Sequence, residues 1–169
     1  FKHTHVIAFP GGIGDSDSFD KLLKPTKDII LESLDKGKKY LGICMGAYWT
    51  DRFYYDILKD ARVVQYIKRP KAEIKRSFGT TIEVNWLDSN EQMFFYDGCA
   101  IIGDESKFTT IARYSNNDPM AIIQDNIGLI GCHPESMPTW YDKPYLKPHW
   151  HYYKHHKLLV DFTKQLLLS

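Results

Sequence analysis

The sequence predicts an α/β fold: a three-layer sandwich around a mostly parallel central sheet of the flavodoxin-like kind, with a strand-rich second half. Two observations carry this prediction. Near the N-terminus, two short apolar runs at residues 5–9 and 40–43 each end at a glycine-containing turn that leads into helix-compatible residues. From residue 80 onward, short apolar runs separated by turn residues replace that alternation.

Length and composition indicate a single domain covering residues 1–169. Hydrophobic residues make up 43% of the chain and charged residues 25%, as in ordinary soluble globular proteins. The formal net charge of +1 and the lack of a long apolar run give no reason to expect nucleic acid or a membrane as a partner. The three cysteines lack metal-ligand spacing, so we expect free thiols in a reducing, cytoplasmic compartment.

The first half is predicted to alternate strands and helices. His5–Phe9 reads as a buried strand that ends at a Pro-Gly-Gly turn, and the loop at Gly11 and Gly12 could expose several main-chain N–H groups. Taken alone, a plain connector is the simpler interpretation of this loop. Apolar residues at helical spacing predict a helix over Pro25–Lys36. Because sites in parallel sheets lie at the carboxyl ends of the strands, we expect the glycine loop and Cys44 at one edge.

The segment Gly42-Ile43-Cys44-Met45-Gly46 has the pattern of a nucleophile elbow. An apolar strand over Tyr40–Ile43 runs into a sharp turn that raises one side chain above the sheet edge, and a helix starts directly behind it. The flanking glycines fit because a Cβ beside such a turn would collide with neighbouring backbone. N–H groups at the start of the helix would favour the thiolate of Cys44, the reactive form. A buried structural cysteine remains the alternative for this pattern standing alone.

Residues 51–75 combine aromatic and basic side chains. Such interleaving is found on surfaces that bind single-stranded nucleic acid. Here, however, acidic residues interrupt the positive charge; they are Asp51, Asp56, Asp60 and Glu73. We therefore expect a solvated face over core aromatic residues.

The second half is predicted to consist of short strands with turns between them. The expected strands are Thr80–Trp86, Met93–Tyr96, Cys99–Ile102, Thr109–Tyr114, Met120–Gln124 and Ile127–Cys132. Asp97-Gly98 and Asp125-Asn126 are turn pairs, and the former is a strong hairpin signal. Cys99 lies within an apolar run and is expected in the core.

A final amphipathic helix is expected over roughly Trp150–Leu168. Its His151 and His155 have the i, i+4 spacing that can hold a metal ion. No carboxylate partner lies nearby in the sequence, so we expect these two histidines to be exposed.

The segment His133-Pro134-Glu135 supplies partners for Cys44. Side chains two residues apart in an extended segment point the same way, so His133 and Glu135 can touch. A cysteine nucleophile needs a base to take its proton, and the base needs a carboxylate to orient its ring. The three residues therefore predict a Cys-His-Glu triad. Cys132, one residue before the histidine, is expected to point the other way and to be a spectator.

Main-chain N–H groups at Gly11, Gly12 and Met45 would hold the oxyanion of a tetrahedral intermediate. Each member of the proposed site also has a simpler interpretation, as a packed cysteine, a histidine at a strand end or a solvated glutamate. Their joint occurrence favours a site.

These motifs resemble those of the class I glutamine amidotransferase superfamily. In that superfamily a Pro-Gly-Gly loop, a Gly-x-Cys-x-Gly elbow and a His-Pro-Glu segment follow in this order. The resemblance implies Cys44 as nucleophile, His133 as base, Glu135 as its orienting acid, and Gly11 with Gly12 as oxyanion loop. It also implies a class I amidotransferase-like fold, whose usual first strand–helix unit we expect to be missing here.

The strongest likeness is to the amidotransferase-like domain found at the N-terminus of some biotin–protein ligases and as a free-standing protein. The run Gly-Ile-Cys-Met-Gly-Ala-Tyr at residues 42–48 resembles the elbow of that group, and residues 95–98, 111–114 and 128–135 follow its later half. The resemblance covers most of residues 5–136. Residues 53–78 and those after 136 match nothing in that group.

The expected activity is hydrolysis of an amide, with glutamine as a candidate substrate, through a thioester on Cys44. No cofactor and no metal are required. The expected partners are a small-molecule amide and a protein partner or ammonia-accepting domain, although no glutamine-recognition segment or synthase domain is visible. Two alternatives remain open: a catalytically silent binding or regulatory module, and a structural or assembly protein that borrowed the fold.

Overall fold

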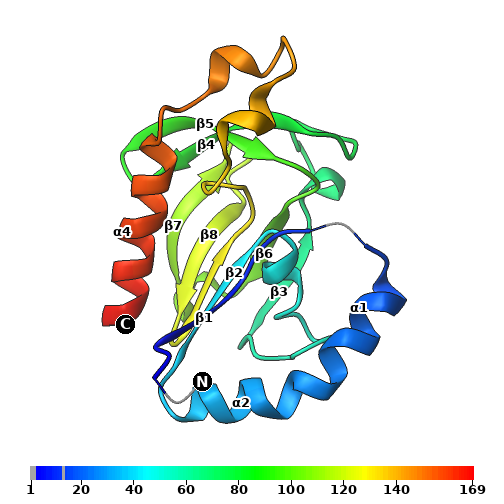
Figure 1. The fold of residues 1–169 in the computed structure, drawn as a ribbon, viewed down its shortest axis with the longest axis vertical. Coiled ribbons are helices and arrows are strands. Elements are labelled where there is room, and N and C mark those ends of the chain that lie inside the picture. The colour runs from blue at the N-terminus through cyan, green and yellow to red at the C-terminus, as the bar shows by residue number, and fades with distance from the viewer. Residues whose placement is uncertain (1–2, 13) are drawn as a thin grey trace.

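The computed structural model describes residues 3–12 and 14–169. Its strands are β1 (Val6–Phe9), β2 (Lys39–Ile43), β3 (Ala61–Gln65), β4 (Thr80–Trp86), β5 (Ser89–Phe95), β6 (Cys99–Gly103), β7 (Thr109–Tyr114), β8 (Pro119–Gln124) and β9 (Ile127–Ile130). Its helices are α1 (Ser16–Leu23), α2 (Lys27–Asp35), α3 (Met45–Tyr48) and α4 (Lys154–Leu168), with 3-10 turns at Lys24–Thr26, Tyr66–Lys68, Glu105–Lys107, Pro138–Tyr141 and Lys147–His149. A seven-stranded sheet has the order β1-β2-β9-β8-β7-β4-β5, and β3 and β6 form a separate pair (Figure 1).

The large sheet is mixed. β1, β2 and β9 pair in parallel, whereas the pairs from β9 through β8, β7 and β4 to β5 are antiparallel. The expectation of a mostly parallel sheet therefore holds only for the three strands at one side. Short connections between consecutive strands explain the antiparallel pairing. The connections β4–β5, β7–β8 and β8–β9 contain only two to four residues. A parallel pair needs a crossover of about a dozen residues or more.

The expected hairpin at Asp97-Gly98 is wrong. β5 pairs with β4 in the large sheet, whereas β6 leaves that sheet and pairs antiparallel with β3. Gly98 passes so close to another strand end that a Cβ there would lie 2.1 Å from the Gly131 carbonyl oxygen. The pair Asp125-Asn126, by contrast, joins β8 to β9 as expected.

The two faces of the large sheet are covered unequally. Helix α4 packs on one face through Phe162 and Leu166, and a Cβ on Gly128 of β9 would lie 2.8 Å from the Phe162 ring. Helices α1 and α2, the single turn α3 and the β3–β6 pair cover the other face, where Tyr40 lies in the core (Figure 1). The α/β prediction is confirmed, and the three-layer arrangement is found in part, with a single helix as one of the outer layers.

The helix predictions differ from the structure mainly at the ends. α2 lies within the expected helix, but α1 was not anticipated; Asp15 caps it by accepting a hydrogen bond from the Ser18 N–H at 2.8 Å. α4 begins at Lys154, four residues later than expected, because Tyr152 and Tyr153 have φ angles of 48° and 66°. These left-handed conformations end any helix that would start at Trp150.

The aromatic and basic segment is folded into the protein and its charges are partly paired. Tyr55 is fully buried, and Arg62 forms two hydrogen bonds with the Asp51 carboxylate at 2.8 and 2.9 Å. Arg69 pairs with Asp118 at 2.7 Å. Tyr55 thus lies in the core under a face of mixed charge, as expected, whereas the neighbouring Phe53 is 70% exposed.

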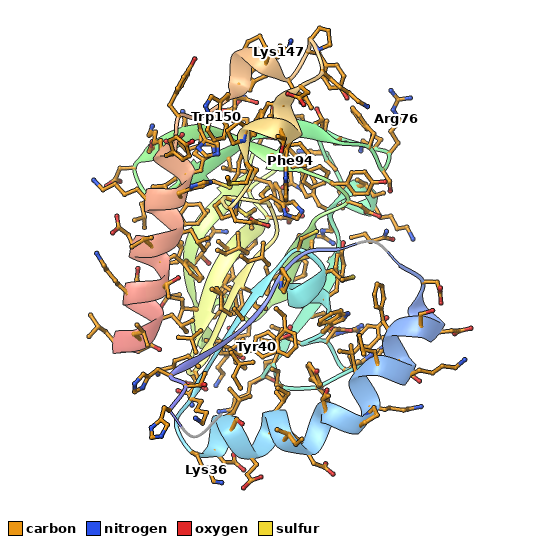
Figure 2. All side chains as sticks on the ribbon, in the orientation of Figure 1. Lys36, Tyr40, Arg76, Phe94, Lys147 and Trp150 are labelled. Carbon is orange, nitrogen blue, oxygen red and sulfur yellow. The ribbon has the colours of Figure 1, made fainter. Side chains whose placement is uncertain are left out.

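Residues 136–153 form a cap over one end of the sheet. Tyr141 and Leu146 pack on Phe94 of β5 as a third apolar cluster, and Trp150 lies against it. Figure 2 shows Phe94 and Trp150 together at this end, with Tyr40 in the other half of the molecule. Within the described residues, no helix has the length and apolar character needed to cross a membrane.

Candidate active site

Cys44 lies on a strained turn between β2 and α3. Its φ and ψ are 51° and −105°, outside the regions that residues other than glycine usually adopt. A Cβ on Gly42 would lie 2.5 Å from the Gly46 carbonyl oxygen, and one on Gly46 would lie 2.1 Å from the Phe9 carbonyl oxygen. Both positions therefore require glycine, as the elbow pattern predicts. The helix behind the turn is only one turn long, so its few free N–H groups, rather than a long helix dipole, face the turn.

The glycine loop after β1 lies directly against the elbow. A methyl group on Gly11 would lie 2.4 Å from His133 Cε1 and 3.3 Å from Cys44 Cβ. A methyl group on Gly12 would lie 2.6 Å from Met45 Cε. The main-chain N–H groups of Gly11, Gly12 and Met45 form no hydrogen bond with another described residue. They are thus available as donors beside the sulfur.

His133 and Glu135 follow β9, which ends at Ile130, two residues earlier than expected. The histidine is 6% exposed, and its Nδ1 lies 2.8 Å from Glu135 Oε1. Its main-chain N–H donates to the Phe94 carbonyl at 2.9 Å, which fixes the segment beside β5. The second carboxylate oxygen of Glu135 is buried and has no partner among the described residues.

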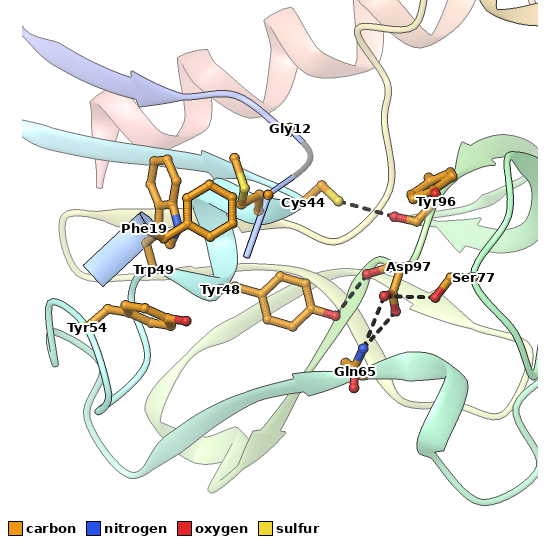
Figure 3. Close-up of a pocket in the computed structure, with 12 residues that line it drawn as sticks. Gly12, Phe19, Cys44, Tyr48, Trp49, Tyr54, Gln65, Ser77, Tyr96 and Asp97 are labelled. Atoms are coloured by element: carbon orange, nitrogen blue, oxygen red, sulfur yellow. Dashed lines mark hydrogen bonds between the residues drawn. The ribbon is translucent and has the colours of Figure 1, made fainter. Parts of the chain in front are cut away.

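The surroundings of His133 favour its charged form. Burial opposes the charge, but the Cys44 and Glu135 side chains beside the ring raise the pKa of His133 to about 10. The Sγ atom of Cys44 also lies 3.5 Å from the Tyr96 carbonyl oxygen (Figure 3). The structure thus brings together the residues that the sequence predicted: Gly11, Gly12, Cys44, Met45, His133 and Glu135.

Two cavities open beside Cys44. The larger has a volume of about 570 Å³ and the smaller about 280 Å³. Cys44, Gly12 and Tyr96 line both cavities, whereas His133 lines only the smaller one. The sulfur therefore lies on the boundary between two spaces that a substrate could occupy together.

The larger cavity contains a polar group of residues that the sequence analysis missed. The Asp97 carboxylate accepts hydrogen bonds from Gln65 Nε2 at 3.1 Å and from Ser77 Oγ at 3.0 Å (Figure 3). The Tyr48 hydroxyl donates to the Asp97 carbonyl at 2.9 Å. In the sequence Asp97 has only the pattern of a turn residue. Gln65 and Tyr48 lie more than thirty residues before it, so no local pattern indicates that the three share a cavity.

The other two cysteines are set apart from this chemistry. Cys99 and Cys132 are completely buried, and all three cysteines are free thiols. Burial raises the pKa of both Cys99 and Cys132 well above its usual range, which keeps them protonated. Cys99 therefore lies in the core as expected, and Cys132 is buried there as well.

The expectation of exposed histidines on the last helix is wrong for His155. Its side chain is 2% exposed, and its Nε2 lies 3.0 Å from a carboxylate oxygen of Glu91, 64 residues earlier in the chain. His151 is partly buried and stacks on His155 with ring centroids 4.2 Å apart. Among the described residues, no group of three or more His, Cys, Asp or Glu side chains could hold a metal ion.

The fold and site together define an α/β protein with an elbow cysteine, a glycine loop and a buried histidine–carboxylate pair at one sheet edge. Residues 1–151 match the family model for class I glutamine amidotransferases. The chain belongs to this family.

Solved structures agree at the level of the fold. A glutamine amidotransferase from Thermotoga maritima has a TM-score of 0.70 and 14% identity, covering 99% of this chain and 80% of that chain. A protein assigned as a GMP synthase subunit, from Thermoplasma acidophilum, has a TM-score of 0.61 and 18% identity, covering 98% and 73%. A further glutamine amidotransferase has a TM-score of 0.62 and 15% identity, covering 95% and 79%. No curated protein sequence matches significantly.

Proposed function

We propose that the protein is a cysteine-dependent amide hydrolase of the glutamine amidotransferase type, with Cys44, His133 and Glu135 as its catalytic triad. The observation that carries the proposal is the position of His133. Its Nδ1 lies 2.8 Å from Glu135 Oε1, and the Cys44 and Glu135 side chains beside it raise its pKa to about 10 although burial opposes its charged form. A carboxylate-oriented imidazole beside a cysteine is the arrangement that activates a thiol nucleophile.

The proposed reaction has two halves: Cys44 is first acylated, and the thioester is then hydrolysed. The Cys44 thiolate attacks the amide carbon, and the N–H groups of Gly11, Gly12 and Met45 stabilise the oxyanion. His133 then gives a proton to the departing nitrogen, and the C–N bond breaks to leave a thioester. In the second half His133 takes a proton from water, which attacks the thioester and releases the acid.

The larger cavity is suited to the acyl part of the substrate. Its described lining residues include one carboxylate, Asp97, and no Lys, Arg or His. An ammonium group, such as that of glutamine, would find an acceptor there. The α-carboxylate of glutamine would find no opposite charge among those residues, so glutamine is one candidate among amides that carry a cationic group.

The lack of a counter-charge for the α-carboxylate also favours a second candidate function, a binding or regulatory module that keeps the triad without turning over glutamine.

A partner is part of both proposals, because one structural neighbour is assigned as a component of GMP synthase. The resemblance of residues 42–48 to the elbow of the biotin–protein ligase N-terminal group leads us to propose a place in that group as well. The free thiols support a cytoplasmic location.

Trapping of an acyl group on Cys44 tests the proposal. Wild-type protein mixed with candidate amides is quenched in acid and its intact mass measured. An adduct equal to the acyl mass that is absent in Cys44→Ser and reduced in His133→Ala supports hydrolysis. No adduct with any amide, together with alkylation of Cys44 that is unaffected by His133→Ala, favours the silent module.

A further inference from the structure

We infer that the smaller cavity receives the amine part of a secondary amide, and that this amine carries a flat apolar substituent such as a benzyl or aryl ring. The inference rests on the proposed hydrolysis and specifies its substrate class beyond glutamine. It follows from the side of Cys44 on which His133 lies, the size of the cavity and the nature of its walls.

The position of His133 decides which part of the substrate enters which cavity. The departing nitrogen must lie within hydrogen-bonding reach of the group that protonates it. His133 lines the smaller cavity and not the larger one, and Cys44 lines both. The nitrogen and everything attached to it therefore point into the smaller cavity, while the acyl chain extends into the larger one.

The size of the smaller cavity exceeds what a primary amide needs. Ammonia, the product from glutamine, is about the size of water and fills on the order of 30 Å³. The cavity has a volume of about 280 Å³. Because an apolar cavity of about 150 Å³ holds a benzene molecule, this space accommodates a ring together with a short linker.

The walls of the cavity are aromatic. Phe94, Tyr96 and Trp140 line it together with the glycine loop, Cys44 and His133. The Trp140 ring meets the rings of Phe94 and His133 edge to face, with centroids 5.1 and 5.3 Å apart. None of its described lining residues is Asp, Glu, Lys or Arg. Such a surface favours a flat apolar group, which stacks at these separations.

Trp140 is held in place by the cap although the residue is 38% exposed. Its main-chain N–H donates to the Met137 carbonyl at 2.9 Å. The neighbouring Tyr141 is 2% exposed, and its hydroxyl lies 2.7 Å from Ser136 Oγ. A rigid wall with an uncovered aromatic face loses little conformational freedom when a ligand covers it.

The inferred reaction needs no reactant other than the amide and water. The Cys44 sulfur forms a bond to the carbonyl carbon, His133 transfers its proton to the nitrogen, and the C–N bond breaks with its electron pair on the amine. The free amine leaves through the smaller cavity. Water later cleaves the thioester to give the acid and the thiol.

Alkylation rates of Cys44 test where a ring binds, whatever the natural acyl group is. Iodoacetamide and N-benzyl iodoacetamide are compared on the whole chain by peptide mass, and each rate is divided by the rate with free glutathione. We expect the benzyl reagent to be favoured on the order of tenfold, the scale of one apolar group in a fitted pocket. The preference should fall in Trp140→Ala, return in Trp140→Phe, and persist in Tyr54→Ala, because Tyr54 lines only the larger cavity.

Equal normalised rates in the wild type would overturn the inference. So would a preference that survives Trp140→Ala and disappears in Tyr54→Ala, since the ring would then occupy the larger cavity. The ratio of the two rates is independent of the absolute reactivity of Cys44. Slow alkylation by both reagents with an intact ratio would therefore contradict the hydrolysis proposal and leave the assignment of the cavity standing.

A second measurement uses two substrates with one acyl group, glutamine and its N-benzyl γ-amide. We expect a higher kcat/KM for the N-benzyl compound, with the ratio lowered in Trp140→Ala. Tyr145→Ala serves as a matched control, because this exposed tyrosine belongs to the same cap and does not line the cavity. Faster hydrolysis of glutamine would contradict the inference and support the proposed function.

Discussion

His133 Nδ1 lies 2.8 Å from Glu135 Oε1, and the two residues are separated by a single proline. This contact fixes the ring so that its other nitrogen is free for Cys44. It also stabilises the charged imidazolium, because burial alone would lower the pKa of the histidine and the pKa is instead raised to about 10. The carboxylate therefore has both an orienting and an electrostatic effect.

Replacement of the carboxylate by an amide tests this relationship. We expect Glu135→Gln to lower the pKa of His133, because the negative charge that raised it is removed. Acylation of Cys44 should slow on the order of 10²–10⁴-fold, the usual effect of a positioned acid–base group. The His133 pKa is followed by NMR of the imidazole carbons, and the acylation by intact mass. An unchanged pKa would contradict the electrostatic effect, and an unchanged rate would contradict the proposed triad.

A methyl group on the glycine loop should disrupt the site locally. In Gly11→Ala the new Cβ would lie 2.4 Å from His133 Cε1, so the imidazole must leave its position beside Cys44 and Glu135 or the loop must shift. We expect loss of acylation and a decrease of about 1–3 kcal/mol in the free energy of unfolding, the typical effect of overpacking. Gly79→Ala is the matched control, because its Cβ would lie 3.4 Å from Phe94, an ordinary contact. Normal acylation in Gly11→Ala would show that the loop does not contact the reacting groups.

The carboxylate in the larger cavity should recognise positive charge. A hydrogen bond to a charged group contributes about 1.5–3 kcal/mol, so Asp97→Asn should raise KM for glutamine about tenfold or more with a smaller change in kcat. Glutaric acid monoamide has the same side chain without the ammonium group, and its KM should change little. An equal effect on both compounds would show instead that Asp97 acts by holding Gln65 and Ser77 in place.

The local patterns of the chain were sufficient to predict the elbow. Two close glycines around Cys44 and an apolar strand before it define a turn that depends on neighbours in sequence, and the structure has that turn. His133 and Glu135 were predicted to touch from their spacing alone, and they do. These features depend on backbone sterics within a few residues.

Features that depend on distant segments were not predictable in the same way. Asp97-Gly98 has the composition of a hairpin, but β6 finds a better partner in β3, which precedes it by more than thirty residues. His155 was expected in solvent because no carboxylate lies near it in sequence, and the fold supplies Glu91. In both cases tertiary pairing overrode a local preference.

His151 of the cap, which is partly buried, and His155 of α4, which is buried, should make the protein sensitive to acid. Burial, followed by the charge of His155, lowers the pKa of His151 to about 4. Burial also lowers the pKa of His155, although hydrogen bonding to Glu91 opposes this effect. Lys154, beside His155, lowers the pKa of that residue further.

The direction of the pH dependence follows from these shifts. A histidine whose pKa is lower in the folded protein than the usual 6.5 is protonated first in the unfolded chain. Its contribution to stability is therefore complete above about pH 6.5 and is lost as the pH falls towards 4. Urea unfolding at several pH values should show a shallower loss in His151→Gln than in the wild type. His149→Gln, at an exposed position of the same cap, should retain the wild-type slope; parallel curves for all three proteins would contradict a role of His151 in acid sensitivity.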